Sequence, residues 1–479
     1  MVRVNDSGQL SCSHKIFDSM KKLIIASLLL LICSYAPARK VGGQVTCGKQ
    51  KLSGVLVSDG YGFAVTDRAG RWSMDISDDA RFVFVITPGG YTADYSSGTP
   101  MYWKPVTEAT GYSFDLYRMQ DTDDYTLFAV ADPQCRTEAH FDQFCAEPLQ
   151  DIKEQAAKYG TEGNVYGLLL GDIAWDTGEV INPLYKKVMP ETGIPVYPVV
   201  GNHDFDKAKR EQFNYEKDFG PMNYAFWAGR DLVIVLRNLF FNKKKLSVEY
   251  SDVELDWLRG LLCHIPDDTH IYIAQHAPLW KLYSEAWAGR GEELLKIVEG
   301  RHVDILSGHT HIQNHFRYSP TVEEHNIAAI CGSWWTVDWC GDATPRGYEI
   351  FRKRDGKLDW FYHPVDYDDD FQFEVILPGH SILNPSMLII NAWDSDEEWT
   401  FEWSEDGKPK GKMTQVWDVS ATYIDKINAA LRDVNIRPYQ RPKKNRHYFG
   451  CTPSGKASKV TVTIRTRFGK EYVREFELQ

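Results

Sequence analysis

The stretch that decides the fold is YTLFAVADPQ, residues 125–134. Its first seven residues are apolar or favour strands and a carboxylate follows at once, so the pattern predicts a buried strand that ends at Asp132. Two further stretches repeat this arrangement, VYGLLLGD at residues 165–172 and VYPVVGNHD at residues 196–204. A helix is expected at residues 138–158, between the first two strands. Strands that alternate with helices predict a layered α/β fold.

The α/β pattern extends well beyond these three strands. Further strands are expected at residues 232–236, 271–274 and 303–306, with helices near residues 253–262 and 292–299. We therefore assign residues 121–364 to one α/β domain.

The regions on both sides of this domain follow a different pattern. Residues 39–120 contain short alternating strands separated by turns such as that at residues 58–60, which predicts a β-sandwich. After an acidic run at residues 366–370, strand and turn patterns return, so residues 365–479 are expected to form a mostly β domain. A chain of 479 residues is too long for one ordinary core, which agrees with three domains.

The overall composition is that of a globular protein. Hydrophobic residues make up 43% of the chain and charged residues 25%, close to average usage. The formal net charge is −12, and the isoelectric point is near 5.7. This acidic balance argues against a nucleic-acid backbone as the main partner, because such partners draw a basic face.

The N-terminus has the layout of a signal peptide. A basic start at residues 20–22 is followed by an apolar run at residues 23–32 and by small residues at 36–38 that suit cleavage. The apolar run is shorter than the roughly 20 residues that span a bilayer. We expect translation to start at Met20, residues 1–38 to be removed, and the mature chain to be periplasmic, secreted or at the cell surface, with no transmembrane segment. A membrane-anchoring or buried segment is the alternative.

Cysteine usage leaves two possibilities open. Cys33 lies where a lipoprotein cysteine would lie, but Ile32 precedes it instead of a small residue, so lipidation is not expected. Nine cysteines less Cys12 and Cys33 leave seven, an odd number that cannot all pair internally. A disulfide between Cys331 and Cys340 is one expectation, and small buried thiols are the other.

Polar residues of metal-ligating types stand where the predicted strands of the α/β domain end. The five clusters are Asp132-Pro133-Gln134, Gly171-Asp172, Gly201-Asn202-His203-Asp204, His276, and Gly308-His309-Thr310-His311. Open α/β sheets place their sites at the carboxyl ends of strands, so these clusters are expected to converge. A single histidine at a strand end is more often structural than a ligand, but five such clusters in order predict a metal centre.

These motifs resemble those of the calcineurin-like metallophosphoesterase family, which run D-x-H, G-D, G-N-H-D/E, H and G-H-x-H in this order. The resemblance covers residues 125–363 and implies a four-layer α/β β-sandwich with flanking helices. The first 75 or so residues of the mature chain are similar to the transthyretin-like β-sandwiches that precede some exported hydrolases.

The family resemblance also implies a dinuclear metal centre. One ion would be held by Asp132, Gln134, Asp172 and His311, and the other by Asp172, Asn202, His276 and His309. Asp172 would bridge them, because two ions about 3.5–4 Å apart need a shared carboxylate to offset their repulsion. A hydroxide between the ions would attack phosphorus, with Asp172 and Asn202 contributing to catalysis as well as to binding.

His203 would lie beside the leaving oxygen and act as general acid or charge stabiliser, by the same resemblance. The residue that orients it is left open between Asp204 and Asp176. Related enzymes sometimes have an Asp at the position where this chain has Trp175.

Gln134 departs from the common family pattern, which has His at this position. Its amide oxygen is a weaker donor than imidazole but suits a hard cation, so Mn, Mg, Fe and Zn all stay open as identities of the two ions. A D-P-Q version occurs in a branch of the family that includes phosphatases, and the substitution therefore does not argue for an inactive enzyme.

Downstream aromatic residues are candidates for substrate binding. Trp334 and Trp335 would form a wall for a sugar or a base, and Arg346 would meet a phosphate. The alternative is that both tryptophans pack against the C-terminal domain. Three histidines match no motif and are expected to be structural or on the surface: His302, His315 and His325.

Two functions from different classes follow. The first is an exported phosphoesterase acting on a small or surface-bound phosphate ester, with a phosphomonoester expected before a phosphodiester. The second is a degenerate, non-catalytic binding protein whose β domains recognise a glycan or a surface, and Gln134 is its only support. Zinc peptidase or amidase chemistry would need an HExxH-like pattern, which the chain lacks. The physiological substrate and the oligomeric state stay open.

Overall fold

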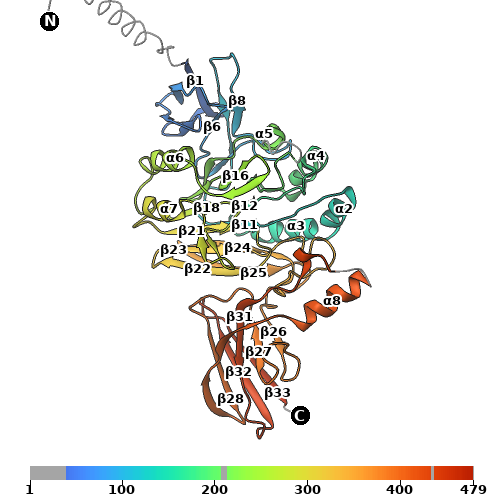
Figure 1. The fold of residues 1–479 in the computed structure, drawn as a ribbon. Helices are drawn as coiled ribbons and strands as arrows, with labels where there is room; N and C mark the ends of the chain where they lie inside the picture. The colour runs from blue at the N-terminus through green and yellow to red at the C-terminus, as the bar shows by residue number, and fades with distance from the viewer. Residues whose placement is uncertain (1–38, 207–212, 433–435, 478–479) are drawn as a thin grey trace, which may run out of the picture.

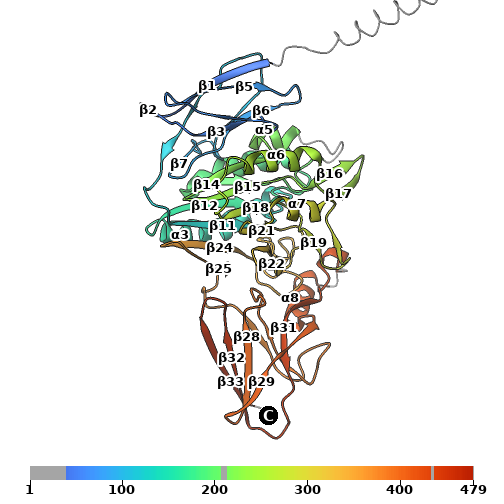
Figure 2. The same ribbon diagram turned by 90° about the vertical axis from the view of Figure 1, so that its left-hand side faces the viewer.

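The computed structural model describes residues 39–206, 213–432 and 436–477. An N-terminal β part, a central α/β part and a C-terminal β part follow one another along the long axis of the molecule (Figure 1). The same order is clear after a quarter turn (Figure 2). The expected signal peptide and Cys33 lie outside the described residues. Within those residues, no helix combines the length and apolar character needed to cross a membrane.

Small sheets build the N-terminal part. One has the order β2-β1-β5 with β9 beside β1, another the order β4-β3-β6-β8, and β7 pairs with β10. The strands are β1 (Arg39–Cys47), β2 (Gln50–Lys51), β3 (Leu56–Ser58), β4 (Phe63–Val65), β5 (Arg71–Ile76), β6 (Phe82–Val85), β7 (Tyr91–Thr92), β8 (Trp103–Pro105), β9 (Phe114–Asp115) and β10 (Tyr117–Arg118).

The N-terminal part shares a core with the α/β part. β5 alternates exposed and buried side chains, as a strand with one solvated face should. Its buried residues belong to the same hydrophobic cluster as the central sheets. At the junction the Trp257 ring lies 5.8 Å from Phe63 and 6.2 Å from Phe84, and its Nε1 donates to Ser58 Oγ at 3.0 Å. This part is therefore fixed on the central domain.

Two sheets face each other in the central part. Their strand orders are β13-β12-β11-β24-β25 and β14-β15-β18-β21-β23-β22. The first contains β11 (Tyr125–Val130), β12 (Asn164–Leu169), β13 (Val196–Pro198), β24 (Gly347–Arg354) and β25 (Lys357–Pro364). The second contains β14 (Tyr224–Ala228), β15 (Asp231–Val235), β18 (Ile271–Ala274), β21 (Val303–Ser307), β22 (Asn314–Ser319) and β23 (Val322–Asn326). In the first sheet β13, β12 and β11 run parallel to one another, and in the second β15, β18 and β21 do, which brings the carboxyl ends of these strands to one edge.

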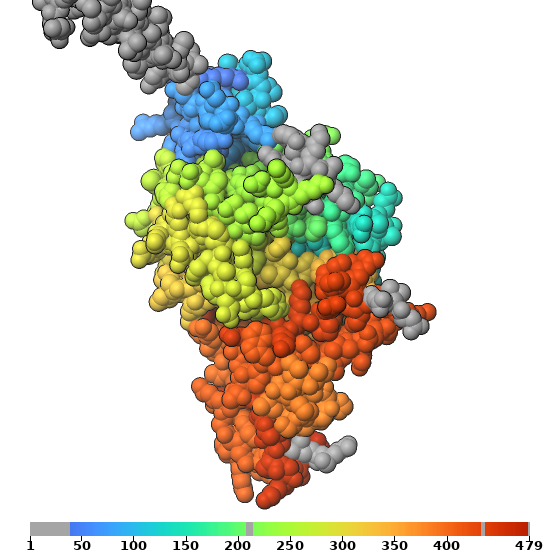
Figure 3. Space-filling model, viewed as in Figure 1, coloured from blue at the N-terminus to red at the C-terminus, as the bar shows by residue number. Residues whose placement is uncertain are grey.

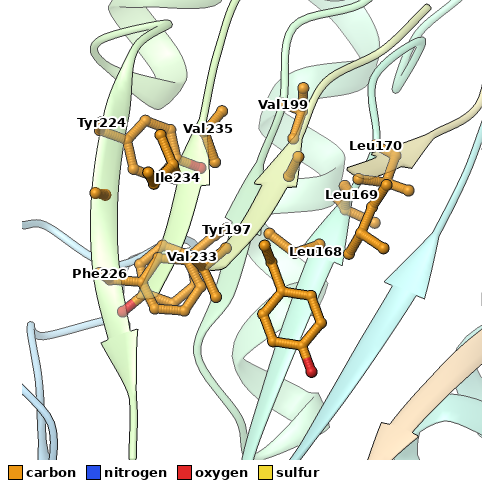
Figure 4. Close-up of a cluster of buried hydrophobic side chains, with 14 of the residues drawn as sticks. Leu168, Leu169, Leu170, Tyr197, Val199, Tyr224, Phe226, Val233, Ile234 and Val235 are labelled. Atoms are coloured by element: carbon orange, nitrogen blue, oxygen red, sulfur yellow. The ribbon is translucent and has the colours of Figure 1, made fainter. Parts of the chain in front are cut away.

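Aromatic and branched side chains fill the space between these sheets. Figure 3 shows the outer surface of the whole molecule, and Figure 4 shows this interior in close-up. Tyr197 of β13 stacks on Phe226 of β14 with ring centroids 3.7 Å apart. Neighbouring residues of β12 and β15, such as Leu168 and Val233, are fully buried. Strands buried on both faces explain why their sequences are continuous apolar runs.

Helices cover the outer faces of the sandwich (Figure 1). They are α2 (Glu138–Ala146), α3 (Pro148–Tyr159), α4 (Gly178–Val188), α5 (Phe213–Phe219), α6 (Asp252–Leu262) and α7 (Gly291–Ile297). Shorter connecting pieces are η1 (Met189–Thr192) and the hairpins β16 (Leu239–Asn242) with β17 (Lys245–Val248) and β19 (Trp280–Lys281) with β20 (Ala286–Trp287). The succession of helix, sheet, sheet and helix confirms the expected four-layer fold.

One predicted element differs from the structure. The single helix expected at residues 138–158 is two helices, α2 and α3, which meet at Glu147 and Pro148. Proline lacks a backbone N–H and clashes with the preceding turn, so it ends one helix and suits the first position of the next.

The C-terminal part is a second β-sandwich with its own core. Its sheets have the orders β26-β27-β31-β30 and β29-β28-β32-β33. The elements are β26 (Glu374–Ile376), β27 (Leu388–Asn391), β28 (Thr400–Glu405), β29 (Lys408–Lys412), β30 (Thr414–Asp418), α8 (Ala421–Leu431), η2 (Pro438–Gln440), β31 (Asn445–Cys451), β32 (Lys459–Arg465) and β33 (Glu471–Glu477). Leu388, Phe401 and Val462 belong to a hydrophobic cluster separate from the central one. In the space-filling view, the orange and red C-terminal residues lie directly against the central domain (Figure 3).

The expected disulfide between Cys331 and Cys340 is absent from the structure. Both side chains are buried free thiols. Cys340 Sγ donates to the Ala329 carbonyl at 3.5 Å, and Cys331 Sγ lies 4.0 Å from His311 Nδ1. The alternative of small buried thiols is the correct one.

Candidate metal centre

The five sequence clusters lie on loops that follow β11, β12, β13, β18 and β21. Several of their residues have left-handed backbone conformations, with φ of 51° at Asp132, 50° at Asp172, 70° at His309 and 53° at His311. Such a conformation costs a residue with a side chain on the order of 1–3 kcal/mol, and it gathers at functional sites. The strained loops therefore indicate that the functional site lies at this edge of the sandwich.

Glycines allow these loops to approach one another. A Cβ atom on Gly201 would lie 2.0 Å from the backbone nitrogen of Asp172. A Cβ atom on Gly308 would lie 2.4 Å from Asp132 Oδ2. Since real Cβ atoms do not come so close, only glycine fits at either position.

The residues predicted for the first ion lie together. His311 Nε2 is 3.3 Å from Asp132 Oδ1, and Gln134 Nε2 donates to Asp172 Oδ2 at 2.9 Å. Asp132 Oδ2 accepts from the backbone N–H of His309 at 2.8 Å, which ties the first cluster to the last.

The residues predicted for the second ion adjoin the first group. His276 Nε2 is 3.4 Å from Asp172 Oδ2 and 3.2 Å from His309 Nδ1. His276 Nδ1 donates to the Leu170 carbonyl at 2.7 Å, which turns Nε2 toward the site. One ligand atom each from Asp172, His276 and His309 lie within 4.8 Å of one another, and Asn202 is also buried.

Burial and neighbouring charges set the protonation of this group. Burial would lower the pKa of His276, but Asp172 and Asp132 outweigh it and raise that pKa to about 10. Burial and the nearby His276 lower the pKa of His309 to about 4. Despite its burial, Asp172 keeps a pKa below its usual range because three imidazoles surround it. A divalent ion would replace the proton that His276 otherwise holds.

The donor set fits two divalent ions. Three buried oxygens have no hydrogen-bond partner: Asp132 Oδ1, Gln134 Oε1 and Asn202 Oδ1. A buried acceptor left unpaired costs about 1–3 kcal/mol, which a bound cation would offset. Two carboxylates, two amide oxygens and three imidazoles together match the ligands that Mn, Fe, Zn and Mg take in proteins.

His203 lies at the edge of this group and is held in place from two sides. Its Nδ1 is 3.0 Å from Asp176 Oδ1, and its backbone N–H donates to Asp172 Oδ1 at 2.8 Å. Burial would lower the pKa of His203, but the hydrogen bond to Asp176 and the charge of Asp172 raise it above the usual value. Asp204 instead accepts from the backbone N–H groups of Gly201 and Ala174. Asp176 is thus the orienting partner that sequence reasoning left open.

Trp335 and Arg346 do not occupy the predicted substrate positions. Trp335 is buried, and its Nε1 donates to the Pro133 carbonyl at 2.9 Å, so it supports the first metal loop from behind. Arg346 is buried between the carboxylates of Glu147 and Asp366. Because its guanidinium already pairs with two carboxylates, Arg346 is not free to bind a substrate phosphate.

Trp334 lies at the site itself. Its ring stacks on His311 with centroids 4.3 Å apart and an interplanar angle of 19°. The Tyr439 ring, from the C-terminal part, lies 4.7 Å away on another side. Trp334 therefore packs against the C-terminal part, as one expectation had it, and also adjoins a predicted ligand, while its substrate role stays a prediction.

Two of the three unassigned histidines are deeply buried. His315 Nε2 is 3.0 Å from Asp394 Oδ1, and His325 Nδ1 is 3.1 Å from Glu349 Oε2. His302 is exposed. The expectation of structural or surface histidines agrees with these positions.

The sequence suggested that an edge of the C-terminal domain helps to close the site, but it did not identify the residues that reach this edge. Lys443 Nζ donates to the Thr310 carbonyl, between His309 and His311, and lies 5.9 Å from the Trp334 ring. No local motif marks Lys443 or Tyr439, because their partners are more than 100 residues away in the sequence.

Comparisons with known proteins identify the family. Three family profiles match in order: the N-terminal domain of calcineurin-like phosphoesterases at residues 39–119, the calcineurin-like phosphoesterase domain at residues 125–313, and the C-terminal domain of these enzymes at residues 324–472. The middle match contains all five clusters. No curated protein sequence matches this chain.

Solved structures of low identity are also similar in part. A dimetal phosphatase from Danio rerio shares 12% identity over 50% of this chain and 97% of that one, with a TM-score of 0.36. A 5'-nucleotidase from Candida albicans shares 12% over 51% of this chain and 52% of that one, with a TM-score of 0.34. Phosphopantetheinyl hydrolase from Mycobacterium tuberculosis shares 15% over 43% of this chain and 89% of that one, with a TM-score of 0.28.

The order of the three matched profiles is the order of the three structural parts. The chain therefore belongs to the calcineurin-like phosphoesterase family and is a metal-dependent phosphoric ester hydrolase with the N-terminal and C-terminal domains of that family.

Proposed function

We propose that this chain is an exported phosphomonoesterase with two divalent metal ions at the centre described above. The observation that carries the proposal is the set of buried oxygens on Asp132, Gln134 and Asn202 that have no hydrogen-bond partner. A degenerate binding protein would have no reason to keep unpaired acceptors buried.

Different residues of the chain would have different roles in hydrolysis. Asp132, Gln134 and His311 would hold one ion, Asn202, His276 and His309 the other, and Asp172 both. When bound, the ions would lower the pKa of a water between them and offset charge on the phosphate oxygens. His203, with its raised pKa, would carry a proton to the leaving oxygen, and Asp176 would keep its ring turned toward that oxygen.

The positive charge near the centre favours a phosphomonoester over a phosphodiester as substrate. A phosphomonoester carries one more negative charge than a diester, and Lys443 brings a cation to the loop between His309 and His311. Arg136 adds another cation over the Trp175 ring, 5.3 Å away. Lys443 and Arg136 would thus add positive charge for a phosphomonoester to that of the metal ions.

Hydrolysis of p-nitrophenyl phosphate and of bis-p-nitrophenyl phosphate tests the proposal. The purified mature chain is assayed with Mn, Mg, Zn and Fe, beside Asp172→Asn and, as a control, Asp142→Asn on the exposed face of α2. We expect metal-dependent turnover, faster on the monoester, that is lost in Asp172→Asn and kept in Asp142→Asn. Failure of every metal to support turnover, with less than one ion bound per chain, would favour the binding protein instead.

Export is tested separately. The basic start at residues 20–22 and the apolar run at residues 23–32 support it. N-terminal sequencing of the chain recovered outside the cytoplasm should begin near Arg39. Recovery of an uncleaved chain in the cytoplasm would contradict this part of the proposal.

A further inference from the structure

Three aromatic rings from three distant segments meet beside His203. The Trp175 ring lies 5.9 Å from the His203 ring, edge to face. Tyr439 approaches Trp175 to 5.7 Å and Trp334 to 4.7 Å, and the two tryptophans are 6.5 Å apart. All three rings are partly exposed, whereas the neighbouring Trp335 is buried. The feature that points to a ligand is the meeting of three partly exposed rings from three distant segments beside His203.

The C-terminal part holds Tyr439 in place firmly. Gln440, the next residue, donates from Nε2 to Thr336 Oγ1 at 2.9 Å, and its carbonyl accepts from Tyr423 at 2.8 Å. The Tyr439 hydroxyl accepts from Arg437 Nη1 at 2.6 Å. The Tyr439 ring is thus held in a fixed position beside Trp175 and Trp334.

We propose that Tyr439, with Trp175 and Trp334, forms a subsite for the leaving group and selects phosphate esters whose alcohol carries a flat ring. The inference rests on the proposed function, because the role of His203 places the leaving oxygen next to Trp175. Aryl groups and nucleobases stack on or pack edge to face against aromatic side chains, and a sugar ring packs against them through its apolar C–H face. The C-terminal domain is then part of the active site.

Charge around the three rings agrees with a neutral or anionic alcohol. Arg136 lies over the Trp175 ring, Lys443 over the Trp334 ring at 5.9 Å, and Arg437 over the Tyr439 ring at 5.9 Å. These cations would repel a quaternary ammonium group, although aromatic rings alone would attract one. Choline esters are therefore excluded from the proposal.

Steady-state kinetics of the full mature chain test the subsite. The substrates are phenyl phosphate, glucose 6-phosphate and adenosine 5'-monophosphate, with glycerol 3-phosphate as the ring-free ester. The variants are Tyr439→Leu, which keeps apolar bulk, and Tyr439→Phe, which keeps the ring. Tyr117→Leu, at an exposed tyrosine of β10, is the matched control.

Tyr439→Leu should lower kcat/KM for the preferred ring ester by roughly tenfold, through KM, and change that for glycerol 3-phosphate by less than about twofold. Tyr439→Phe and Tyr117→Leu should retain the selectivity of the wild type. The ester that loses the most kcat/KM in Tyr439→Leu shows whether the subsite takes an aryl group, a sugar or a nucleoside.

Equal losses on all four esters in Tyr439→Leu would assign Tyr439 a structural role and overturn the subsite. Unchanged kinetics on all four would overturn it as well. Absence of turnover by the wild type on every ester would instead remove the proposed function, and the two failures are therefore distinct.

Discussion

The position of a single imidazole determines how this enzyme would treat its leaving group. His203 is held by Asp176 at Nδ1 and by Asp172 through its own backbone N–H, and under the proposed function its Nε2 would carry the proton to the leaving oxygen. Asp176 has a left-handed φ of 58°, which turns its carboxylate back toward this ring. The strained backbone of Asp176 thus helps to orient the His203 ring.

His203→Ala should keep both metal ions and lose kcat by roughly 10²–10⁴-fold, as expected for removal of a general acid. Asp176→Asn should fall between this variant and the wild type, because an amide can still hold the ring but does not favour its charged form. Metal content by plasma emission, measured beside kcat, checks the prediction. Loss of both ions in His203→Ala would show that the residue is needed for binding instead.

At the scale of elements, the candidate metal centre depends on the close contact between the loop after β12 and the loop after β13. The loop after β13 passes over the loop after β12 at Gly201, where a Cβ atom would lie 2.2 Å from Asp172 Oδ1. The Asp172 carboxylate has no room to move away, because its other oxygen accepts a hydrogen bond from Gln134 and adjoins His276.

Gly201→Ala should therefore abolish metal binding and turnover while the domain stays folded. The matched control is Gly111→Ala, since nothing lies within 4 Å of a Cβ atom there. Metal titration by calorimetry, together with the melting temperature, checks this prediction. Full metal binding in Gly201→Ala would mean that the loops separate more easily than their contacts indicate.

A chain of buried imidazoles and carboxylates links the strands of the second sheet with β24 and the C-terminal part. In order along the chain of contacts, the residues are Asp231, His270, Asp304, His325, Glu349, His315 and Asp394. The separations run from 2.8 to 3.5 Å. The negative carboxylates and the positive imidazoles of this chain alternate and compensate one another's charge. Polar residues can therefore stand in the protein interior where apolar ones would otherwise pack.

Stability should fall at alkaline pH because of this chain. Burial would lower the pKa of His270, but Asp231 and Asp304 raise it to about 9. A pKa raised by folding contributes stability below the unfolded value of 6.5, and this contribution disappears as the pH rises through about 9. The difference in melting temperature between the wild type and His270→Gln should therefore be largest near pH 6 and shrink by about pH 10. A difference independent of pH would contradict the charged state of His270.

At the scale of the whole molecule, ion pairs and aromatic contacts join the C-terminal sandwich to the central domain. Arg467 follows β32 and pairs with Glu323 of β23 at 2.9 Å and with Asp396 at 2.8 Å. Its guanidinium also lies over the Trp360 ring at 4.8 Å. The Arg467 side chain is only 10% exposed, so these pairs are shielded from solvent.

Arg467→Ala should lower the free energy of unfolding by about 3 kcal/mol, because it removes the ion-pair partner of the nearly buried Asp396 carboxylate, whereas Glu323 keeps its pair with Arg317. Arg465→Ala is the matched control: Arg465 pairs with Glu402 and Glu471 at the surface, where such pairs contribute about 0–1 kcal/mol. Denaturant unfolding of both variants measures the difference. Equal effects would show that the junction does not depend on Arg467.

The sequence by itself determined the layers of this protein and which residues would lie together at the candidate metal centre. The apolar runs that became β11, β12 and β18 are local patterns, and a carboxylate or imidazole directly after each run is placed by the end of its strand. The break at Pro148 was also visible in the sequence, although one helix was predicted across it.

Only the tertiary structure decided what surrounds the centre. Asp176 rather than Asp204 orients His203 because of how two loops cross, and Trp335 supports a loop while Trp334 meets the site. Tyr439 reaches Trp175 across more than 250 residues of sequence. Strand periodicity and motif spacing carry information over a few residues, whereas contacts between distant segments depend on packing of the whole chain, which no local pattern encodes.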